Sequence, residues 1–217
     1  TLKLLYKAQA ELERLYHALM EKSEEFNHVI KMGRTQLQDA VPIRLGQEFH
    51  AYATAIRRDI NRFDRAKEEM RHLNLGGTAI GTGLNADVKY LQRVVKNISL
   101  ISGLELIQAY DLIDATQNLD GYVACSGIAK SCAVNLSKMC NDLRLMSSGP
   151  RTGLGEINLP AKQNGSSIMP GKVNPVIPEA VNQVAFHVIG NDMTVAMAAE
   201  AGQLELNAFE PIIFYKL

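Results

Sequence analysis

The sequence is 217 residues long, and its 23 Lys and Arg residues balance its 23 Asp and Glu residues, which leaves a formal net charge of zero. A neutral chain lacks the basic surface that nucleic acids require, so we expect no nucleic-acid partner. The hydrophobic fraction of 47% excludes a disordered chain, and neither a membrane-spanning apolar run nor a leader peptide can be recognised.

Two long helices are predicted in the first seventy residues. Apolar side chains recur at heptad spacing in the first of them: Leu5, Leu12, Leu19 and Phe26. This pattern is typical of a helix that packs in a bundle. A second apolar series from Leu45 to Met70 predicts another long helix, with Pro42 in its first turn, where proline is tolerated.

The middle of the chain combines a glycine-rich segment with two further helices. Segment 73–86 is uncharged and has four glycines, which predicts a tightly packed loop. Asp87 is a candidate N-cap for a helix that ends near Gly103. The longest helical pattern extends over about residues 114–147 and stops at a Ser-Gly-Pro sequence.

Three cysteines, Cys125, Cys132 and Cys140, fall along one stripe of this longest helix. Their odd number and their spacing favour buried free thiols over a disulfide or a zinc site. Free thiols are typical of a reducing compartment, so we expect a cytoplasmic protein.

A loop rich in Gly, Asn and Pro over about residues 149–175 precedes a last helix that begins near residue 176. No strand-period alternation is recognised, so the predicted class is all-α, a bundle of long helices. The stretches 180–191 and 193–199 carry almost no charge, which predicts a helix buried on most sides. One chain cannot bury so much apolar surface, and we therefore expect an oligomer with a shared bundle.

Several chemistries are excluded by missing motifs. The sequence has no G-x-S-x-G element, and its glycine clusters lack the lysine spacing of a phosphate-binding loop. Its histidines are scattered without a metal-ligand spacing, so we expect no metal and no cofactor.

The segment 165–175, GSSIMPGKVNP, is the most unusual in the chain. Asn174 is a good N-cap and Pro175 suits a first helical position. A helix N-terminus favours anions, and Lys172 adds a positive charge beside it. By these residues alone, the segment is either an anion site or simply a turn.

This segment also matches in full the signature G-S-S-x-M-P-x-K-x-N-P and therefore resembles the aspartase/fumarase superfamily. Segments 33–49, 76–85 and 147–160 resemble its other blocks in the same order, so the resemblance covers residues 31–211. Gln36 replaces a histidine typical of fumarases, which favours the aspartase branch. The resemblance implies elimination of ammonia from L-aspartate to give fumarate. The alternatives are fumarate hydratase acting on L-malate and a helical oligomerisation domain without catalysis.

The resemblance also implies roles for individual residues. Ser166 would be the general base, as an alkoxide stabilised by loop amides and a nearby cation. Lys172 and Asn174 would hold the substrate carboxylate, and Thr35 and Gln36 would bind substrate from another stretch of chain. Two further residues would support the site without touching the substrate: Ser167 and Glu179.

The family organisation implies a homotetramer whose active sites are each shared by three subunits, with a small dicarboxylate or amino-acid substrate. The chain begins at Thr1 rather than Met and lacks the superfamily's first substrate-binding block and its small C-terminal domain. We therefore expect residues 1–217 to be the central helical domain of a longer protein, inactive as a lone subunit.

Overall fold

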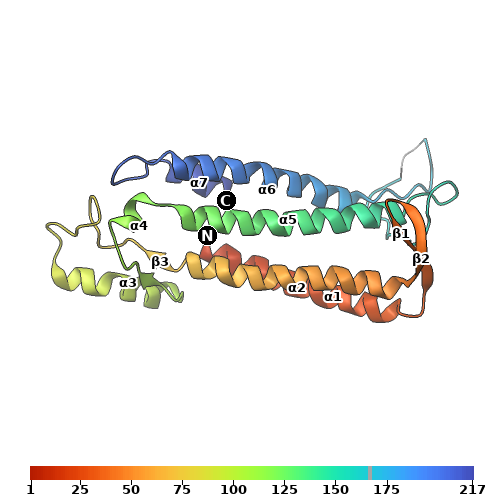
Figure 1. Ribbon diagram of the computed structural model, residues 1–217, viewed down its shortest axis with the longest axis horizontal. Helices are drawn as coiled ribbons and strands as arrows, with labels where there is room; N and C mark the ends of the chain where they lie inside the picture. The colour runs from red at the N-terminus through yellow and green to blue at the C-terminus, as the bar shows by residue number, and fades with distance from the viewer. Residues whose placement is uncertain (166–167) are drawn as a thin grey trace. The chain divides into compact units, whose positions relative to one another are not determined.

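The computed structural model describes residues 1–165 and 168–217, and it is dominated by helices (Figure 1). The all-α prediction is confirmed. The helices of the described residues are α1 (Leu2–Glu25), α2 (Leu45–Glu69), α3 (Val88–Ser102), α4 (Asp114–Gln117), α5 (Asp120–Met146), α6 (Val176–Glu200) and α7 (Glu210–Lys216).

The helices form where the apolar spacing and the capping residues predicted them. The heptad leucines of α1 are buried, and so is one face of α2 that includes Phe49, Ile56 and Ile60. The Asp87 carboxylate accepts a hydrogen bond of 2.7 Å from the backbone N–H of Lys89 at the start of α3. Gly103 ends the same helix with a φ of 67°, a left-handed conformation that favours glycine.

The expected absence of strands was wrong. Residues 30–44 form an antiparallel hairpin of β1 (Ile30–Thr35) and β2 (Gln38–Arg44), and the two-residue strands β3 (His72–Leu73) and β4 (Ile107–Gln108) pair in parallel. Pro42 lies in β2 and not in a helix. The hairpin escapes sequence analysis because much of β2 is exposed, so no alternation of buried and exposed residues marks it.

Two helix boundaries differ from the predictions, and one helix was not predicted. The first helix ends at Glu25 instead of near residue 30. The pattern over 114–147 is divided because Asn118 adopts an extended conformation and ends α4 before α5 begins. Helix α7 was not expected at all. Its seven residues show too little periodicity to predict a helix.

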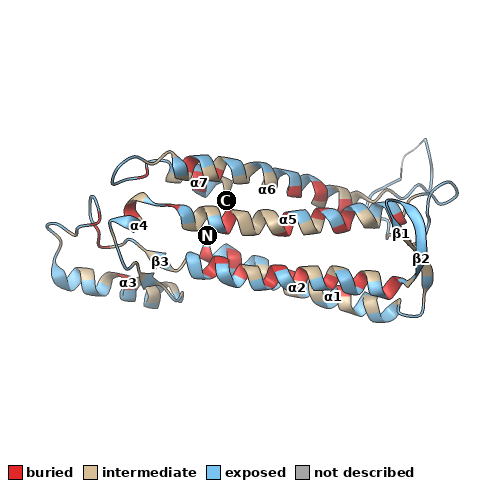
Figure 2. Ribbon diagram, in the orientation of Figure 1, coloured by how far each residue is buried: buried red, intermediate tan, exposed pale blue. Residues whose placement is uncertain are grey.

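The chain divides into two compact units. The first unit contains residues 1–9, 61–130 and 190–217, and the second contains residues 10–60 and 131–189. A buried cluster in the first unit comprises Leu119, Val195, Ala198 and Ile213, with Tyr122 packed against it. In the second unit, buried residues follow one side of α2 and of α5, as the red segments of these helices indicate (Figure 2).

Helix α6 leaves large apolar side chains exposed on this single chain: Val184, Phe186, Met193 and Met197. The burial expected for this helix requires further subunits, so it stays a prediction. Isolated exposed apolar residues are common, but several on one helix leave much apolar surface without cover. Within the described residues, no helix is long and apolar enough to cross a membrane.

Candidate functional site

The described residues among the predicted site residues belong to the second unit, where they lie in the hairpin turn and in the signature loop with the first turn of α6. The first element is the signature loop, residues 165–175. Its described residues 165 and 168–173 are exposed, and the backbone N–H of Lys172 donates to Met169 O at 3.2 Å. A Cβ at Gly165 would lie 3.7 Å from both Gly171 N and Lys172 O, so the two ends of the loop meet. The predicted Ser166 and Ser167 lie outside the described residues.

Helix α6 begins directly after this loop. Asn174 and Pro175 are half-buried, and the backbone N–H of Glu179 donates to Pro175 O at 3.1 Å. Glu179 is in the first turn, with its carboxylate 3.9 Å from the Arg144 guanidinium on α5. Lys172, exposed beside the N-terminus of a helix of 25 residues, gives the region two sources of positive potential.

The second element is the turn of the β1–β2 hairpin, which carries Thr35 and Gln36. Thr35 pairs with Gln38, so the connection consists of Gln36 and Leu37 alone. Their φ angles are 53° and 63°, the pattern of a tight hairpin turn normally made with asparagine and glycine. Thr35, Gln36 and Leu37 are all exposed. The turn thus presents its polar side chains outward.

The described contacts do not bring these two elements together. Among the described residues, no hydrogen bond or ion pair joins Thr35 or Gln36 to Lys172, Asn174 or Glu179. Within the described residues, a site that uses both elements therefore has no direct polar link between them.

A cluster of four charged residues at the base of the hairpin escaped sequence analysis. We call Lys31, Arg34, Glu48 and Glu156 the hairpin charge cluster. Lys31 Nζ lies 2.9 Å from Glu48 Oε2 and 2.7 Å from Glu156 Oε2, and Arg34 Nη1 lies 2.6 Å from Glu156 Oε1. The side chains of Lys31 and Glu156 are only 9% and 15% exposed. Two cations and two carboxylates therefore balance one another in a mostly buried position.

The protonation of this cluster follows from its geometry. Burial acts to raise the pKa of Glu156, but the hydrogen bonds and charges of Lys31 and Arg34 outweigh it and hold the pKa below its usual range. The hydrogen bond to Glu156 raises the pKa of Arg34. Glu156 and Arg34 are thus both charged near neutrality.

No local signal could have found this cluster, because β1 and Glu156 are separated by more than a hundred residues in sequence. The only indication in the sequence is that Arg34 and Glu48 lie in segment 33–49, Glu156 lies in segment 147–160, and Lys31 lies two residues before the first of these segments. The resemblance identified these segments without assigning a role to their charges.

Asp192 and the three cysteines lie apart from the predicted site residues in sequence and have contacts typical of structural groups. In the first unit, Asp192 accepts hydrogen bonds from Ser126 at 2.8 Å and from Lys130 at 2.5 Å. Cys125, Cys132 and Cys140 are buried and form no disulfide, as predicted, and burial raises the pKa of Cys125 to about 11. No group of His, Cys, Asp and Glu side chains within 1–165 and 168–217 could hold a metal ion.

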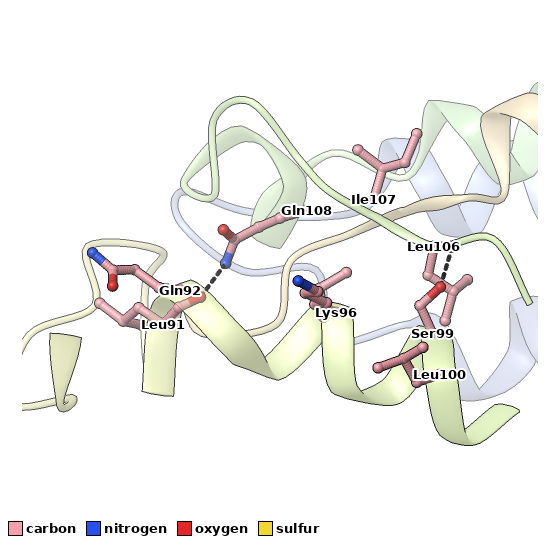
Figure 3. Close-up of a pocket in the computed structure, with 9 residues that line it drawn as sticks. Leu91, Gln92, Lys96, Ser99, Leu100, Leu106, Ile107 and Gln108 are labelled. Carbon is pink, nitrogen blue, oxygen red and sulfur yellow. Dashed lines mark hydrogen bonds between the residues drawn. The ribbon is translucent and has the colours of Figure 1, made fainter. Parts of the chain in front are cut away.

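A pocket of about 370 Å³ lies in the first unit between α3 and the segment that carries β4 (Figure 3). Leu91, Val95 and Leu106 are among its apolar lining residues, and Lys96, Ser99 and Gln108 add polar groups. Gln108 Nε2 donates to Leu91 O at 3.3 Å, which fixes the edge of the pocket. None of the predicted site residues lines it.

The sequence and the fold of this chain are similar to those of known lyases. A family model described as "Lyase" matches residues 2–190. The chain is 57% identical to an aspartate ammonia-lyase of Bacillus subtilis over 217 residues, which are 100% of this chain and 46% of that protein. The chain therefore spans less than half the length of this relative.

Two solved structures are also similar. One is a structure titled fumarate lyase:delta crystallin from Brucella melitensis bound to cobalt, with a TM-score of 0.95 and 57% identity over 99% of this chain and 47% of that one. The other is a class II fumarase from Schistosoma mansoni, with a TM-score of 0.87 and 36% identity over 96% of this chain and 47% of that one.

Proposed function

This chain belongs to the aspartase/fumarase superfamily of lyases, and we propose that the protein of which it is part eliminates ammonia reversibly from L-aspartate to give fumarate. The observation that carries the proposal is the complete signature GSSIMPGKVNP in a chain 57% identical to an aspartate ammonia-lyase. Gln36 in the hairpin turn, where fumarases of the superfamily typically have histidine, supports L-aspartate over L-malate as the substrate.

The reaction removes a weakly acidic C–H proton beside a carboxylate. The electron pair that remains adds a second negative charge to that carboxylate, so catalysis requires fixed positive potential at this position. The sequence of the signature loop supports this requirement, since the positively charged Lys172 precedes the first residue of α6, Val176, by four residues. In the proposal, Lys172 and Asn174 hold the carboxylate that gains charge.

The proton acceptor in this proposal is Ser166, as an alkoxide, with Ser167 beside it. A serine hydroxyl ionises near neutrality only where amides and a cation stabilise the oxyanion. Thr35 and Gln36 bind the other polar groups of the substrate from the hairpin turn. Glu179 has no direct contact with the substrate and interacts instead with Arg144.

We further propose a cytoplasmic homotetramer in which several subunits contribute to each site. Two observations support shared sites: the described contacts do not join the hairpin turn to the signature loop, and α6 exposes Phe186, Met193 and Met197. A shared helix bundle would cover these side chains. The buried free thiols support a reducing compartment.

The test is a comparison of substrates with the whole protein. We expect L-aspartate to produce fumarate, followed by its ultraviolet absorbance, at a rate well above that of L-malate. A higher rate on L-malate would make the protein a fumarase. No turnover of either substrate by a stable oligomer would favour a helical assembly domain without catalysis.

A further inference from the structure

Glu156 connects the end of α5 with the strand that leads into the substrate-binding turn. The backbone N–H of Glu156 donates to Met146 O at 2.8 Å, so the residue is fixed at the last turn of α5. Its carboxylate contacts β1 through both oxygens, with Oε1 2.6 Å from Arg34 Nη1 and Oε2 2.7 Å from Lys31 Nζ. One carboxylate therefore holds two points of β1 against α5.

A distortion of the hairpin allows both cations to reach this carboxylate. Lys31 and Arg34 are three residues apart, and in a regular strand such side chains point to opposite faces. The pairing with β2 is irregular between Met32 and Arg34, and irregularities of this kind increase the local twist. A Cβ at Gly33 would lie 2.8 Å from Val41 O, so only glycine permits the close approach of the two strands.

The turn beyond Arg34 is strained. Gln36 and Leu37 have positive φ angles, which are unfavourable for residues that carry a Cβ, and such residues persist only where the surroundings hold them. Both side chains are exposed and contribute no packing of their own. The strong interactions that lie next to this turn in sequence are those of Arg34 with Glu156 and, at 3.6 Å, with Asp39.

We propose that Glu156 is a positioning residue, which fixes the turn bearing Thr35 and Gln36 for substrate binding by holding Lys31 and Arg34. This inference rests on the proposed function, in which Thr35 and Gln36 bind substrate. The carboxylate also neutralises two cations that would otherwise attract substrate carboxylates beside the turn. Among the described residues, no hydrogen bond or ion pair joins Glu156 to Thr35, Gln36 or Leu37, so the effect is transmitted through β1.

The first test compares Glu156→Gln and Glu156→Asp with Asp192→Asn in the whole protein. Asp192 is a matched control, since it is a mostly buried carboxylate that accepts hydrogen bonds from Lys130 and Ser126. We expect kcat/KM for L-aspartate to fall on the order of 10²-fold in E156Q, mainly through a higher KM, and less in E156D. The D192N variant should remain within about twofold of wild type.

A double-mutant cycle separates positioning from general stability. If Glu156 acts through the turn, E156Q should cost much less activity in a Gln36→Ala background than in the wild type. Losses that multiply independently would overturn the proposal. If E156Q does not assemble, E156D and Arg34→Lys carry the same cycle, because each keeps the charge and changes the reach of one partner.

Hydrogen exchange of peptides covering residues 33–40 distinguishes a failure of this inference from a failure of the proposed function. Faster exchange in E156Q than in wild type, with no change in D192N, supports the positioning role, and equal exchange overturns it. A wild-type protein that converts neither L-aspartate nor L-malate refutes the proposed function, and hydrogen exchange then still decides whether Glu156 holds the hairpin.

Discussion

The β1–β2 hairpin and the signature loop carry the two halves of the proposed substrate site, and they are held in opposite ways. The hairpin is fixed at its base by the mostly buried hairpin charge cluster, with Lys31 Nζ also 3.4 Å from Met146 Sδ. The signature loop is exposed at residues 165 and 168–173, and among them one backbone hydrogen bond connects Met169 with Lys172.

This difference predicts that substitutions in the two elements change different kinetic parameters. A turn that is fixed in advance binds substrate without a large ordering cost, so its residues should act mainly on KM. The described residues of the signature loop are exposed, so in the proposed function we expect substrate or a neighbouring subunit to complete the site around them. Substitutions in the loop should therefore lower kcat, alone for the proposed base Ser166 and together with a change in KM for the substrate-binding Lys172.

The largest expected effect is that of Ser166→Ala. Removal of the proposed base should lower kcat for L-aspartate on the order of 10³-fold while the protein still assembles, because the side chain serves only the chemical step. Steady-state kinetics and size-exclusion chromatography check both parts. Ser167→Ala is the matched control, and its loss should be far smaller. Full activity of the Ser166 variant would refute the assigned base.

Lys172→Met should have the next largest effect. Loss of the ammonium beside the N-terminus of α6 should lower kcat/KM by about 10²-fold, with both kcat and KM affected, since the charge binds the substrate carboxylate and stabilises the enediolate. Lys162→Met removes another exposed lysine upstream of the same loop and should leave the kinetics unchanged. Equal losses in the two variants would mean that only general positive potential matters.

An acid titration tests whether the ion pairs of Glu156 stabilise the hairpin, the more firmly held of the two regions. The pKa of Glu156 lies below its ordinary value of 4.5, so the stabilisation it provides is complete above that value and is lost as the pH falls through the lowered pKa. The melting temperature of E156Q should therefore be lower than that of wild type by a few degrees at neutral pH, and the difference should shrink below about pH 4.5. Circular dichroism measures both. A difference independent of pH would contradict the ion-pair explanation.

The smallest expected effect concerns the strain in the hairpin turn. Leu37 is 69% exposed with a φ of 63°, so Leu37→Gly removes an unfavourable conformation and loses little packing. We expect the free energy of unfolding to rise by about 0.5 kcal/mol, because relief of strain outweighs the added flexibility of the unfolded chain. Chemical denaturation measures the change. Leu37→Ala keeps the Cβ and should show no gain.

Local sequence determined most of the long helices and the family to which the chain belongs. Apolar residues at heptad spacing specify α1, Asp87 and Gly103 specify the ends of α3, and GSSIMPGKVNP specifies the family, because each of these signals lies within a few helical turns. The same signals failed for the hairpin. Gln36 and Leu37 are not residues that a tight turn normally selects, so nothing nearby in the sequence marks it.

Only the tertiary structure decided that Lys31 and Arg34 converge on Glu156 and that, among the described residues, no hydrogen bond or ion pair joins the hairpin turn to the signature loop. These facts depend on segments that are distant in sequence and become neighbours through folding. Helical periodicity reports which face of a segment is apolar, but it contains no information about which distant carboxylate balances a buried cation. The pairing of these cations with Glu156 depends on how the segments of the second unit pack against one another.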